Sequence, residues 1–561
     1  MPSVLENYSS LTPTSPRKHI LAVLQSAMND ARQALALLKT LGRTKAVSDL
    51  IATQKNLSIL RVLFLHYRQS DPEASNEALR CVANALLLIE RGRTLWVDED
   101  VGGSEVVIDM LRRSSSPDQI FLACRILFLC TASPSLSSSY ITTLVGGTTS
   151  TKTPTIVELI GSNLDSLTAA CQSGASMSKE AMTDLLKFTF NLLNHYPKLV
   201  PCNPQDPLAQ PKETEPKVIG DFWNTRLDGL LPPLLRAFNT LPLPSPSPLS
   251  APLSHVIHCL ITIPCSLELR PVWFKGGASE TSESPALGSP GSAFSVTGHE
   301  DRNESSKTGP IERALSALSI HRRSSSSRPS SPPSPSLITS VDTLSRAYTL
   351  LDLSMEHYLP GNIDVDEPSI RDKCRQEGIY TLDDAISPVT VLLSRLCLSY
   401  EDAKVRVREW LLPATLDRTS PLELRSDLLG RCIRFLGSVY HPRLKDAVGE
   451  MLFAICDSDA GVLSAYLGYG NVAGFLYHKG VMAAPPRPSS TAAPSSTPDG
   501  TPIDPITGVA VVNDEGPDMT EEEKEREAER LFVLFDRLER TGAIRPGQNP
   551  LRQAMQRMSG Q

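Results

Sequence analysis

This chain is a long succession of amphipathic helical segments, and that pattern limits its fold more than any other feature. Short Gly, Pro, Ser or Asp breaks separate the segments, and apolar residues recur within them at three- and four-residue spacing. The clearest examples are residues 49–69, 73–91, 117–132, 179–196, 218–240, 382–398, 401–416, 421–440 and 443–456. No stretch of alternating Val, Ile and Thr between turn residues competes with this pattern. We therefore predict an all-α fold.

Helices paired across short breaks are typical of armadillo and HEAT repeats, whose period is about 40–47 residues. A chain of 561 residues is too long for one core, but a solenoid avoids this limit because each repeat buries its apolar face against its neighbours. We predict that residues 1–480 form an armadillo/HEAT-like, right-handed superhelical solenoid with a concave groove.

Three stretches of different composition interrupt the helical pattern. Residues 276–336 are rich in Ser, Pro and Gly, which predicts a disordered insertion. Residues 201–217 read as a shorter polar loop, and residues 481–517 as a Pro/Ser/Thr-rich linker that follows the solenoid. Residues 546–561 are expected to form a tail.

Between the linker and the tail, residues 518–545 predict a tethered amphipathic helix. Thr520 and Glu523 have the spacing of a capping box, which stabilises a helix N-terminus. A narrow apolar stripe follows on an otherwise charged segment and includes Leu531, Phe535 and Leu538. Such a helix either packs back on its own solenoid or docks on a partner, and the residues alone do not decide between these alternatives.

Composition excludes several classes of protein. The 55 basic and 62 acidic residues give a formal net charge of −7, so the overall charge favours neither nucleic acid nor a membrane as a partner. The 11 cysteines are scattered, mostly in apolar runs, which is typical of reduced, buried thiols: Cys81, Cys124, Cys130, Cys397 and Cys432 are examples. With neither a signal peptide nor an apolar run of ~18 residues, we predict a cytoplasmic protein.

We find no pattern that predicts catalysis. Residues 146–152 lack the Gly before Lys152 and the preceding strand of a phosphate-binding loop. Residues 468–474 have one residue too many before their third Gly for a dinucleotide turn, and a tight turn where helices approach closely is the better interpretation. His and Cys in segment 255–265 match no zinc spacing. We predict no metal, no cofactor and no covalent chemistry.

A groove between helices would need polar residues that bind a guest polypeptide. Asn84 and Asn191 lie in apolar helices, where each amide either bonds within the solenoid or faces the groove. Lys39 and Arg43 are four residues apart, so on a helix both would reach one carboxylate, although an exposed basic pair is the alternative. A nuclear import adaptor would repeat Trp followed four residues later by Asn, and none of the four Trp here has that neighbour.

Six segments resemble those of synembryns, in the same order and over nearly the whole chain. They are EALRCVANALL at 77–87, RILFLCTA at 125–132, LLKFTFNLL at 185–193, GYGNVAG at 468–474, IDPITG at 503–508 and MTEEEKEREAERLFVLFDRLERTGAI at 519–544. The resemblance implies a guanine nucleotide exchange factor for GDP-bound heterotrimeric G protein α subunits. Such a factor stabilises the nucleotide-free state and also acts as a chaperone for nascent α subunits.

The resemblance also implies which residues bind the α subunit. By position, Lys39 and Arg43 look like the basic pair that receives the terminal carboxylate of the α subunit, and Asn84 like a groove asparagine. Further groove-wall candidates are Phe128, Phe188 and Asn191. The apolar stripe of the C-terminal helix, which includes Leu531, Phe535 and Leu538, would contact the GTPase domain. We expect a monomer recruited to the cell cortex or plasma membrane through α subunits, or alternatively a passive scaffold that binds helical peptides without affecting nucleotide.

The chain departs from the family pattern in its regulatory sequences. Animal synembryns carry an acidic, phosphorylatable stretch after the glycine motif, whereas residues 483–502 here are Pro/Ser/Thr-rich with a single Asp. In the insertion, Ser324 and Ser325 follow two arginines, which makes them candidates for phosphorylation by basophilic kinases. An unregulated loop is the alternative interpretation.

Overall fold

The computed structural model describes residues 11–15, 17–26, 31–147, 153–200, 223–244, 247–274, 342–481 and 496–511, together with positions 520, 522, 525, 526 and 529. Every regular element within these ranges is a helix, and strand-type pairing there is limited to two isolated bridges, Ser496 with Pro502 and Ile503 with Ala510. The all-α prediction is therefore confirmed for the described residues. The predicted insertion at 276–336 and the loop at 201–217 lie outside them.

The chain divides into two compact units. Unit 1 comprises Met1–Leu411 and Ser426–Ser458, and unit 2 comprises Leu412–Arg425 and Asp459–Gln561. Unit 2 contains η2 (Leu422–Leu424), α23 (Ala460–Leu467) and α24 (Tyr469–His478). The organisation predicted from sequence, with a solenoid to residue 480 followed by linker, helix and tail, stays a prediction.

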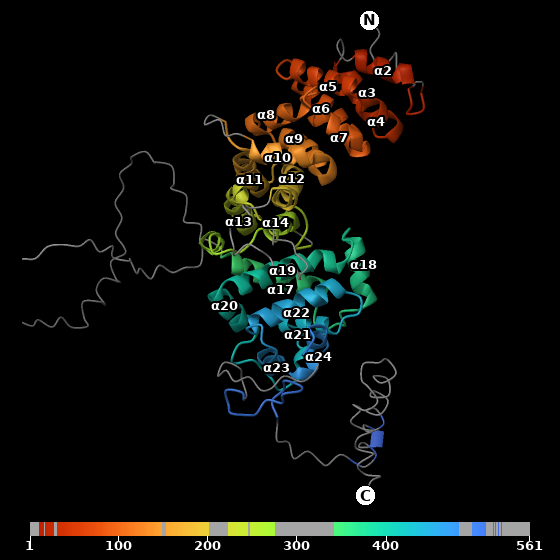
Figure 1. Cartoon of the computed structure of the whole chain (residues 1–561). Helices are drawn as coiled ribbons and strands as arrows, with labels where there is room; N and C mark the ends of the chain where they lie inside the picture. Colours follow the sequence, from red (N-terminus) through yellow and green to blue (C-terminus); the bar gives the residue numbers. More distant parts are fainter. Residues whose placement is uncertain are drawn as a thin grey trace, which may run out of the picture. The chain divides into compact units, whose positions relative to one another are not determined.

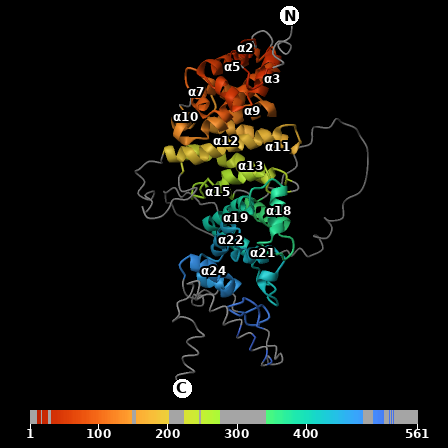
Figure 2. The same cartoon turned by 90° about the vertical axis from the view of Figure 1, so that its right-hand side faces the viewer.

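Unit 1 is built from two layers of helices, in which each helix packs on the next of its own layer and most also pack on one of the other layer. Layer A contains α5 (Gln54–Tyr67), α8 (Gly103–Arg113), α11 (Ile156–Gln172), α13 (Leu231–Thr240), α17 (Thr343–Tyr358) and α21 (Leu428–Leu436). Layer B contains α3 (Ala31–Leu41), α6 (Pro72–Leu88), α9 (Pro117–Thr131), α12 (Ser178–Leu199), α14 (Leu253–Leu260), α19 (Leu382–Ser399) and α22 (Pro442–Ile455). Successive layer helices lie side by side in both Figure 1 and Figure 2.

The remaining helices of unit 1 connect the two layers or extend the ends of the layers. They are α2 (Arg17–Ser26), α4 (Lys45–Ile51), α7 (Glu90–Val97), α10 (Pro134–Gly146), η1 (Thr225–Leu230), α15 (Arg270–Trp273), α18 (Pro368–Gln376) and α20 (Glu401–Leu411). One connecting helix, one layer A helix and one layer B helix follow each other three times, as α4–α6, α7–α9 and α10–α12.

Local capping sets where several helices begin, and it corrects two predicted boundaries. The segment predicted as one helix over 49–69 is broken before α5, because the Thr53 side chain accepts a hydrogen bond from Asn56 N and starts a new helix. The segment predicted over 421–440 becomes helical only at Leu428, where Asp427 caps Gly430 N. Both predictions followed the apolar pattern and overlooked the capping residue.

Asparagines satisfy the backbone carbonyls at the ends of neighbouring helices. The last four carbonyls of an α-helix have no partner within the helix. The side-chain amides of layer helices donate to such carbonyls: Asn56 to Leu50, Asn84 to Lys39, Asn163 to Leu111, and Asn191 to Phe128. Later in the chain arginines take this role: Arg346 donates to Phe238 and Arg431 to Leu359. These side chains therefore join each helix end to the adjacent helix.

The core is aliphatic and contains most of the described cysteines. The five cysteines predicted to be buried are buried and free of disulfides, as expected, and burial raises the pKa of Cys130 and of Cys397 to about 12. Their thiols are therefore protonated and unreactive at neutral pH. Within the described ranges, no helix combines the length and the apolar character that crossing a membrane requires.

In unit 2, the two short motifs at 468–474 and 503–508 bind each other. The amides of Tyr469 and Gly470, at the start of α24, donate to the carbonyls of Pro505 and Ile506, both at 2.8 Å. Gly468 has a positive φ of 82°, and a Cβ there would lie 2.5 Å from Gly508 N. Only glycine fits such an approach. The tight turn predicted at 468–474 therefore exists, but the approaching segment is residues 503–508.

Candidate functional site

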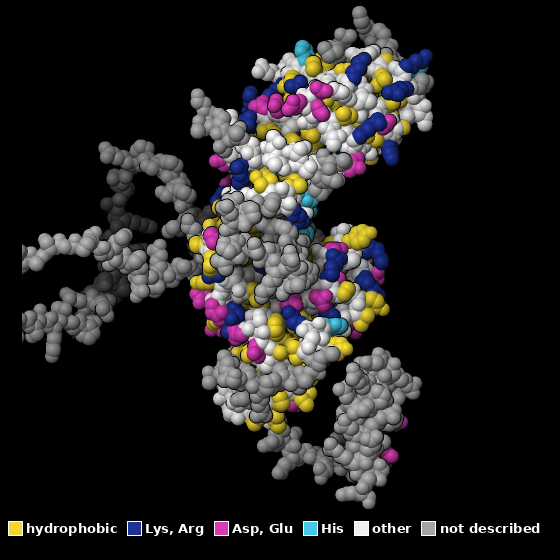
Figure 3. Space-filling view, in the orientation of Figure 1, with side chains coloured by type: hydrophobic (Ala, Val, Ile, Leu, Met, Phe, Trp, Pro, Cys, Tyr) yellow, Lys and Arg dark blue, Asp and Glu magenta, His cyan; other side chains and the backbone are white. Residues whose placement is uncertain are grey.

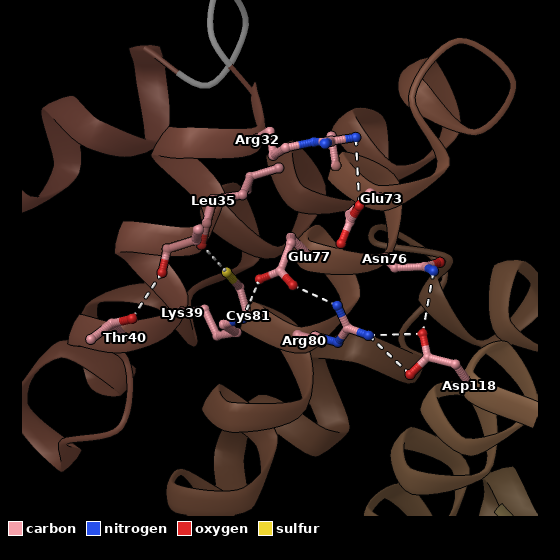
Figure 4. A network of polar contacts seen from close by, with 12 residues as sticks. Arg32, Leu35, Lys39, Thr40, Glu73, Asn76, Glu77, Arg80, Cys81 and Asp118 are labelled. Carbon is pink, nitrogen blue, oxygen red and sulfur yellow. Dashed lines mark hydrogen bonds and ion pairs between the residues drawn. The ribbon is translucent and has the colours of Figure 1, made fainter. Parts of the chain in front are cut away.

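Charged side chains form a network on layer B, across α3, α6 and α9 (Figure 4). Glu77 Oε2 lies 2.7 Å from Lys39 Nζ, and Glu77 Oε1 accepts a hydrogen bond from Arg80 Nη1 at 2.5 Å. Arg80 Nη2 also donates to both carboxylate oxygens of Asp118, at 2.8 and 2.9 Å. The network thus links three successive helices of the layer through one carboxylate and one guanidinium.

A second cluster of the same kind lies on α9 and α12. Asp184 Oδ2 accepts a hydrogen bond from Arg125 Nε at 2.5 Å, and Asp184 Oδ1 lies 3.6 Å from Lys187 Nζ. The Lys187 ammonium lies 5.8 Å from the centre of the Phe128 ring, within the range of a cation–π contact. Here again one carboxylate holds two cations on adjacent helices.

Glu77 and Asp184 are buried, whereas the bases around them reach the surface. The side chains of Glu77 and Asp184 are 7% and 1% exposed, and those of the four bases around them are 28–32% exposed. Each buried carboxylate therefore acts as a fixed counter-ion that holds two cations in place at the surface. A guest that approaches this face meets oriented N–H donors, which suits carboxylate groups.

The pKa values of the two buried acids are shifted in opposite directions in the folded protein. Burial is the largest single effect on Glu77 and acts to raise its pKa, but hydrogen bonds and charges from Lys39 and Arg80 together lower the pKa below its ordinary value of 4.5. Burial raises the pKa of Asp184, and the neighbouring Arg125 and Lys187 offset this only in part. The fold therefore favours the charged form of Glu77 and disfavours that of Asp184.

We predict that Glu77→Gln destabilises the protein more than Asp184→Asn does. The first substitution removes a charge that the folded state favours, at a cost of about 2 kcal/mol, whereas Asn replaces a carboxylate whose charge the folded state disfavours. Because the pKa of Glu77 is lowered on folding, its stabilisation is present above its unfolded pKa and is lost as pH falls through its folded pKa. Urea unfolding at pH 7 and below pH 4.5 measures both effects, and a larger loss for Asp184→Asn at pH 7 would contradict the prediction.

The predicted basic pair does not lie on one helix. Helix α3 ends at Leu41, and Arg43 lies in the turn that follows, so the predicted spacing of one helical turn is wrong. Gly42 N closes the last turn by donating to Leu38 O at 2.8 Å, and Arg43 N reaches Thr40 O only at 3.4 Å. Arg43 is exposed, and its guanidinium bonds to no other described side chain, whereas Lys39 is paired with Glu77.

The predicted groove asparagines use their amide hydrogens within layer B. Asn84 Nδ2 donates to Lys39 O at 3.1 Å, and Asn191 Nδ2 donates to Phe128 O and Thr131 Oγ1, both at 3.1 Å. Asn84 is half-buried, and its Oδ1 accepts no hydrogen bond from the described residues. Asn84 therefore joins α6 to α3, and its Oδ1 is left with acceptor capacity.

The predicted aromatic and C-terminal candidates differ in accessibility. Phe128 is half-buried beside Lys187, but Phe188 is completely buried, so its ring contacts only its own chain and we leave it out of the proposed site. Outside the described residues lie the other predicted positions: Leu531, Phe535 and Leu538 of the C-terminal stripe, and the candidate phosphorylation sites Ser324 and Ser325. Of the predicted C-terminal helix, Glu522, Glu525, Arg526 and Glu529 are described, and they are helical and exposed.

Sequence reasoning overlooked the residues that organise this site. Glu77 and Arg80, like Asp184 and Lys187, are three residues apart on one helix, and each acid stands where the apolar pattern expects a buried residue. An acid at a position where the apolar pattern expects a buried residue was the sequence feature that could have indicated these clusters. The basic partners of these acids on the adjacent helices are far away in sequence, so no local pattern predicts the pairing.

Comparisons with known proteins assign the chain to a family. Fixed charges on packed helices are suited to binding a polypeptide. Among the described residues, no three or more potential metal ligands lie together. The sequence profile of the Ric8 family, described as guanine nucleotide exchange factor synembryn, matches residues 34–558. The chain belongs to this family.

Individual relatives match over shorter stretches. The chain is 30% identical over 187 residues to the chaperone Ric-8A of Macaca fascicularis, which covers 31% of this chain and 35% of the relative. It is 30% identical over 178 residues to the chaperone ric-8 of Caenorhabditis elegans, covering 30% and 31% of the two chains. A synembryn-like chaperone of Schizosaccharomyces pombe is 30% identical over 183 residues, covering 30% and 34%. These matches span about a third of the relatives' length.

Proposed function

We propose that this protein is a guanine nucleotide exchange factor and folding chaperone for heterotrimeric G protein α subunits. The family assignment supports this proposal, since the family is described as an exchange factor and its relatives are named chaperones. The charged face of layer B carries the proposal structurally, because buried carboxylates hold cations there in fixed positions. The bound element is the C-terminal helix of the α subunit, which ends in a carboxylate.

We propose an armadillo/HEAT-type solenoid as the scaffold. The threefold recurrence of a connecting helix, a layer A helix and a layer B helix, followed by pairs of layer helices, supports this class. In such a scaffold layer B lines the groove. Lys39 and Arg43 then bind the terminal carboxylate of the guest, Asn84 binds a backbone donor, and Phe128 and Asn191 belong to the wall.

The proposed mechanism is differential binding. A guest helix held in the groove is not available to pack on its own GTPase domain, and its loss loosens the nucleotide site. The factor shifts this equilibrium only by as much as it binds the nucleotide-free state more tightly than the GDP-bound state. Exchange then needs no bond formation, metal or cofactor from this chain. A nascent α subunit also lacks nucleotide, so the preference for the nucleotide-free state accounts for the chaperone role as well.

The segment at 518–545, with Leu531, Phe535 and Leu538, is proposed as the second contact, on the GTPase domain. We further propose that the protein acts as a monomer in the cytoplasm and reaches the cell cortex or plasma membrane through its α subunits. Ser324 and Ser325 are proposed as phosphorylation sites that adjust this activity.

The competing function is a passive scaffold that binds helical peptides. Isolating the complex with the α subunit distinguishes an exchange factor from such a scaffold. GDP-loaded α subunit is mixed with the protein, the complex is isolated by size-exclusion chromatography, and its nucleotide content is measured. An exchange factor yields a complex depleted of GDP that dissociates when GTP is added. A complex that retains one GDP per α subunit would favour the scaffold.

A further inference from the structure

Outside the charged network of layer B, unit 1 displays large apolar side chains at two neighbouring turns. Tyr380, in the turn after α18, is 96% exposed, and Val439 and Tyr440, in the turn before α22, are 77% and 61% exposed. Figure 3 shows hydrophobic and basic side chains close together over the α18 region. Single exposed apolar residues need no explanation, but a cluster of this kind marks interaction sites.

These turns share one cavity, and its lining is basic. Tyr380 and Tyr440 line a cavity of about 420 Å³ together with Arg371 and Arg375 of α18, and no carboxylate is among the lining residues. The Arg371 guanidinium lies 4.5 Å from the centre of the Tyr440 ring. The lining of the cavity also includes the apolar residues Cys374, Ile379 and Leu382. We call the set Arg371, Arg375, Tyr380, Val439 and Tyr440 the Tyr380 surface.

The nearby carboxylates of Asp366 and Asp383 accept hydrogen bonds from the turn before α22 and from the start of that helix. Asp366 accepts hydrogen bonds from Ser438 Oγ at 2.7 Å, Val439 N at 2.8 Å and Tyr440 N at 3.2 Å. Asp383 accepts from Leu444 N at 3.1 Å at the start of α22. The turn that displays Val439 and Tyr440 is therefore fixed by three bonds to a single side chain. A rigid, preorganised turn loses little entropy when it binds a partner.

Asp372, an acid on α18, compensates the charge of the surface only weakly. Arg375 Nη1 lies 2.8 Å from Asp372 Oδ1, but these side chains are 78% and 60% exposed, and exposed pairs of this kind are weak. Arg371 has no carboxylate partner among the described residues, since its described contact is the Tyr440 ring. Tyr and Arg are also the residues that most often dominate binding at protein interfaces.

We infer that the Tyr380 surface binds an acidic segment with an apolar anchor on the α subunit, at a contact separate from the groove of layer B. The inference rests on the proposed function for the identity of the partner. The arginines pair with carboxylates of the segment, and the anchor enters the cavity between Tyr380 and Tyr440. Asp366 is a positioning residue, because it fixes the turn without touching the partner.

Calorimetry with GDP-bound α subunit and the full chain tests this inference. We expect Tyr380→Ala with Tyr440→Ala, and separately Arg371→Glu with Arg375→Glu, to weaken binding tenfold or more. The charge-reversed variant should also lose part of the salt dependence of binding, the rest coming from the groove of layer B. Matched controls are Leu267→Ala, which removes a side chain that is 70% exposed elsewhere, and Arg112→Glu with Arg113→Glu on layer A.

A second ligand separates this inference from the proposed function. A peptide of the α subunit's C-terminal helix should bind wild type and both Tyr380-surface variants with equal affinity. Unchanged affinity of the variants for whole α subunit would overturn the inference alone, as would an equal loss for peptide and whole protein, because the contact would then not be separate. If folded wild-type protein binds neither ligand, both the inference and the proposed function fail. Circular dichroism and thermal unfolding establish that each variant is folded.

Discussion

Replacing Lys39 and Arg43 together by alanine is expected to weaken binding of the α subunit's C-terminal peptide tenfold or more. A hydrogen bond to a charged group contributes about 1.5–3 kcal/mol, and each 1.4 kcal/mol changes the affinity tenfold. Arg43 is exposed with its guanidinium unbonded to described side chains, so its donors are available to a terminal carboxylate. Calorimetric titration of the peptide measures the change.

The terminal carboxylate of the peptide allows a matched control for this prediction. Wild-type protein should bind a peptide with an amidated C-terminus at least tenfold more weakly than the free acid, whereas the double variant should bind both peptides alike. Lys39 also pairs with Glu77, so Arg43→Ala alone tests the site without disturbing the network. Equal affinity of the folded double variant and wild type for the free acid would remove both residues from the site.

Deleting residues 518–561 is expected to abolish most of the exchange activity while leaving peptide binding intact. The proposed groove binds the guest helix by itself, but opening the nucleotide site requires that the GTPase domain be held at a second contact. Exchange on whole α subunit and calorimetry with the C-terminal peptide measure the two effects separately. A full-length variant with Leu531, Phe535 and Leu538 replaced by serine tests the stripe without shortening the chain. Full exchange activity of the truncated protein would reject the second contact.

Local sequence patterns correctly predicted that the described residues are all-α. Apolar spacing identified the helices because each buries one face, and apolar runs identified Cys81 and Cys432 as buried because such thiols pack as small apolar groups. The same patterns failed at boundaries. Apolar spacing alone did not predict that α3 ends at Leu41 or that α21 begins after the capping residue Asp427, so Arg43 was placed on a helix that has already ended.

The contacts that organise the candidate site depend on residues far apart in the chain. Glu77 pairs with Lys39, and Arg125 pairs with Asp184, across successive layer helices whose packing no local pattern specifies. The motif at 503–508 similarly resembled a family segment without revealing that its carbonyls cap the start of α24. Phe188 was assigned to the groove wall because a helical pattern does not tell which apolar residue faces the core.

Release of labelled GDP from a purified α subunit tests the central claim most directly. The rate is measured in excess unlabelled nucleotide, with increasing concentrations of this protein and with the Lys39→Ala/Arg43→Ala variant as a matched control. We predict that the release rate rises with protein concentration to a plateau, and that the variant needs a concentration tenfold higher or more for the same effect. A release rate that stays at its intrinsic value, although the α subunit is saturated with the protein, would contradict the account.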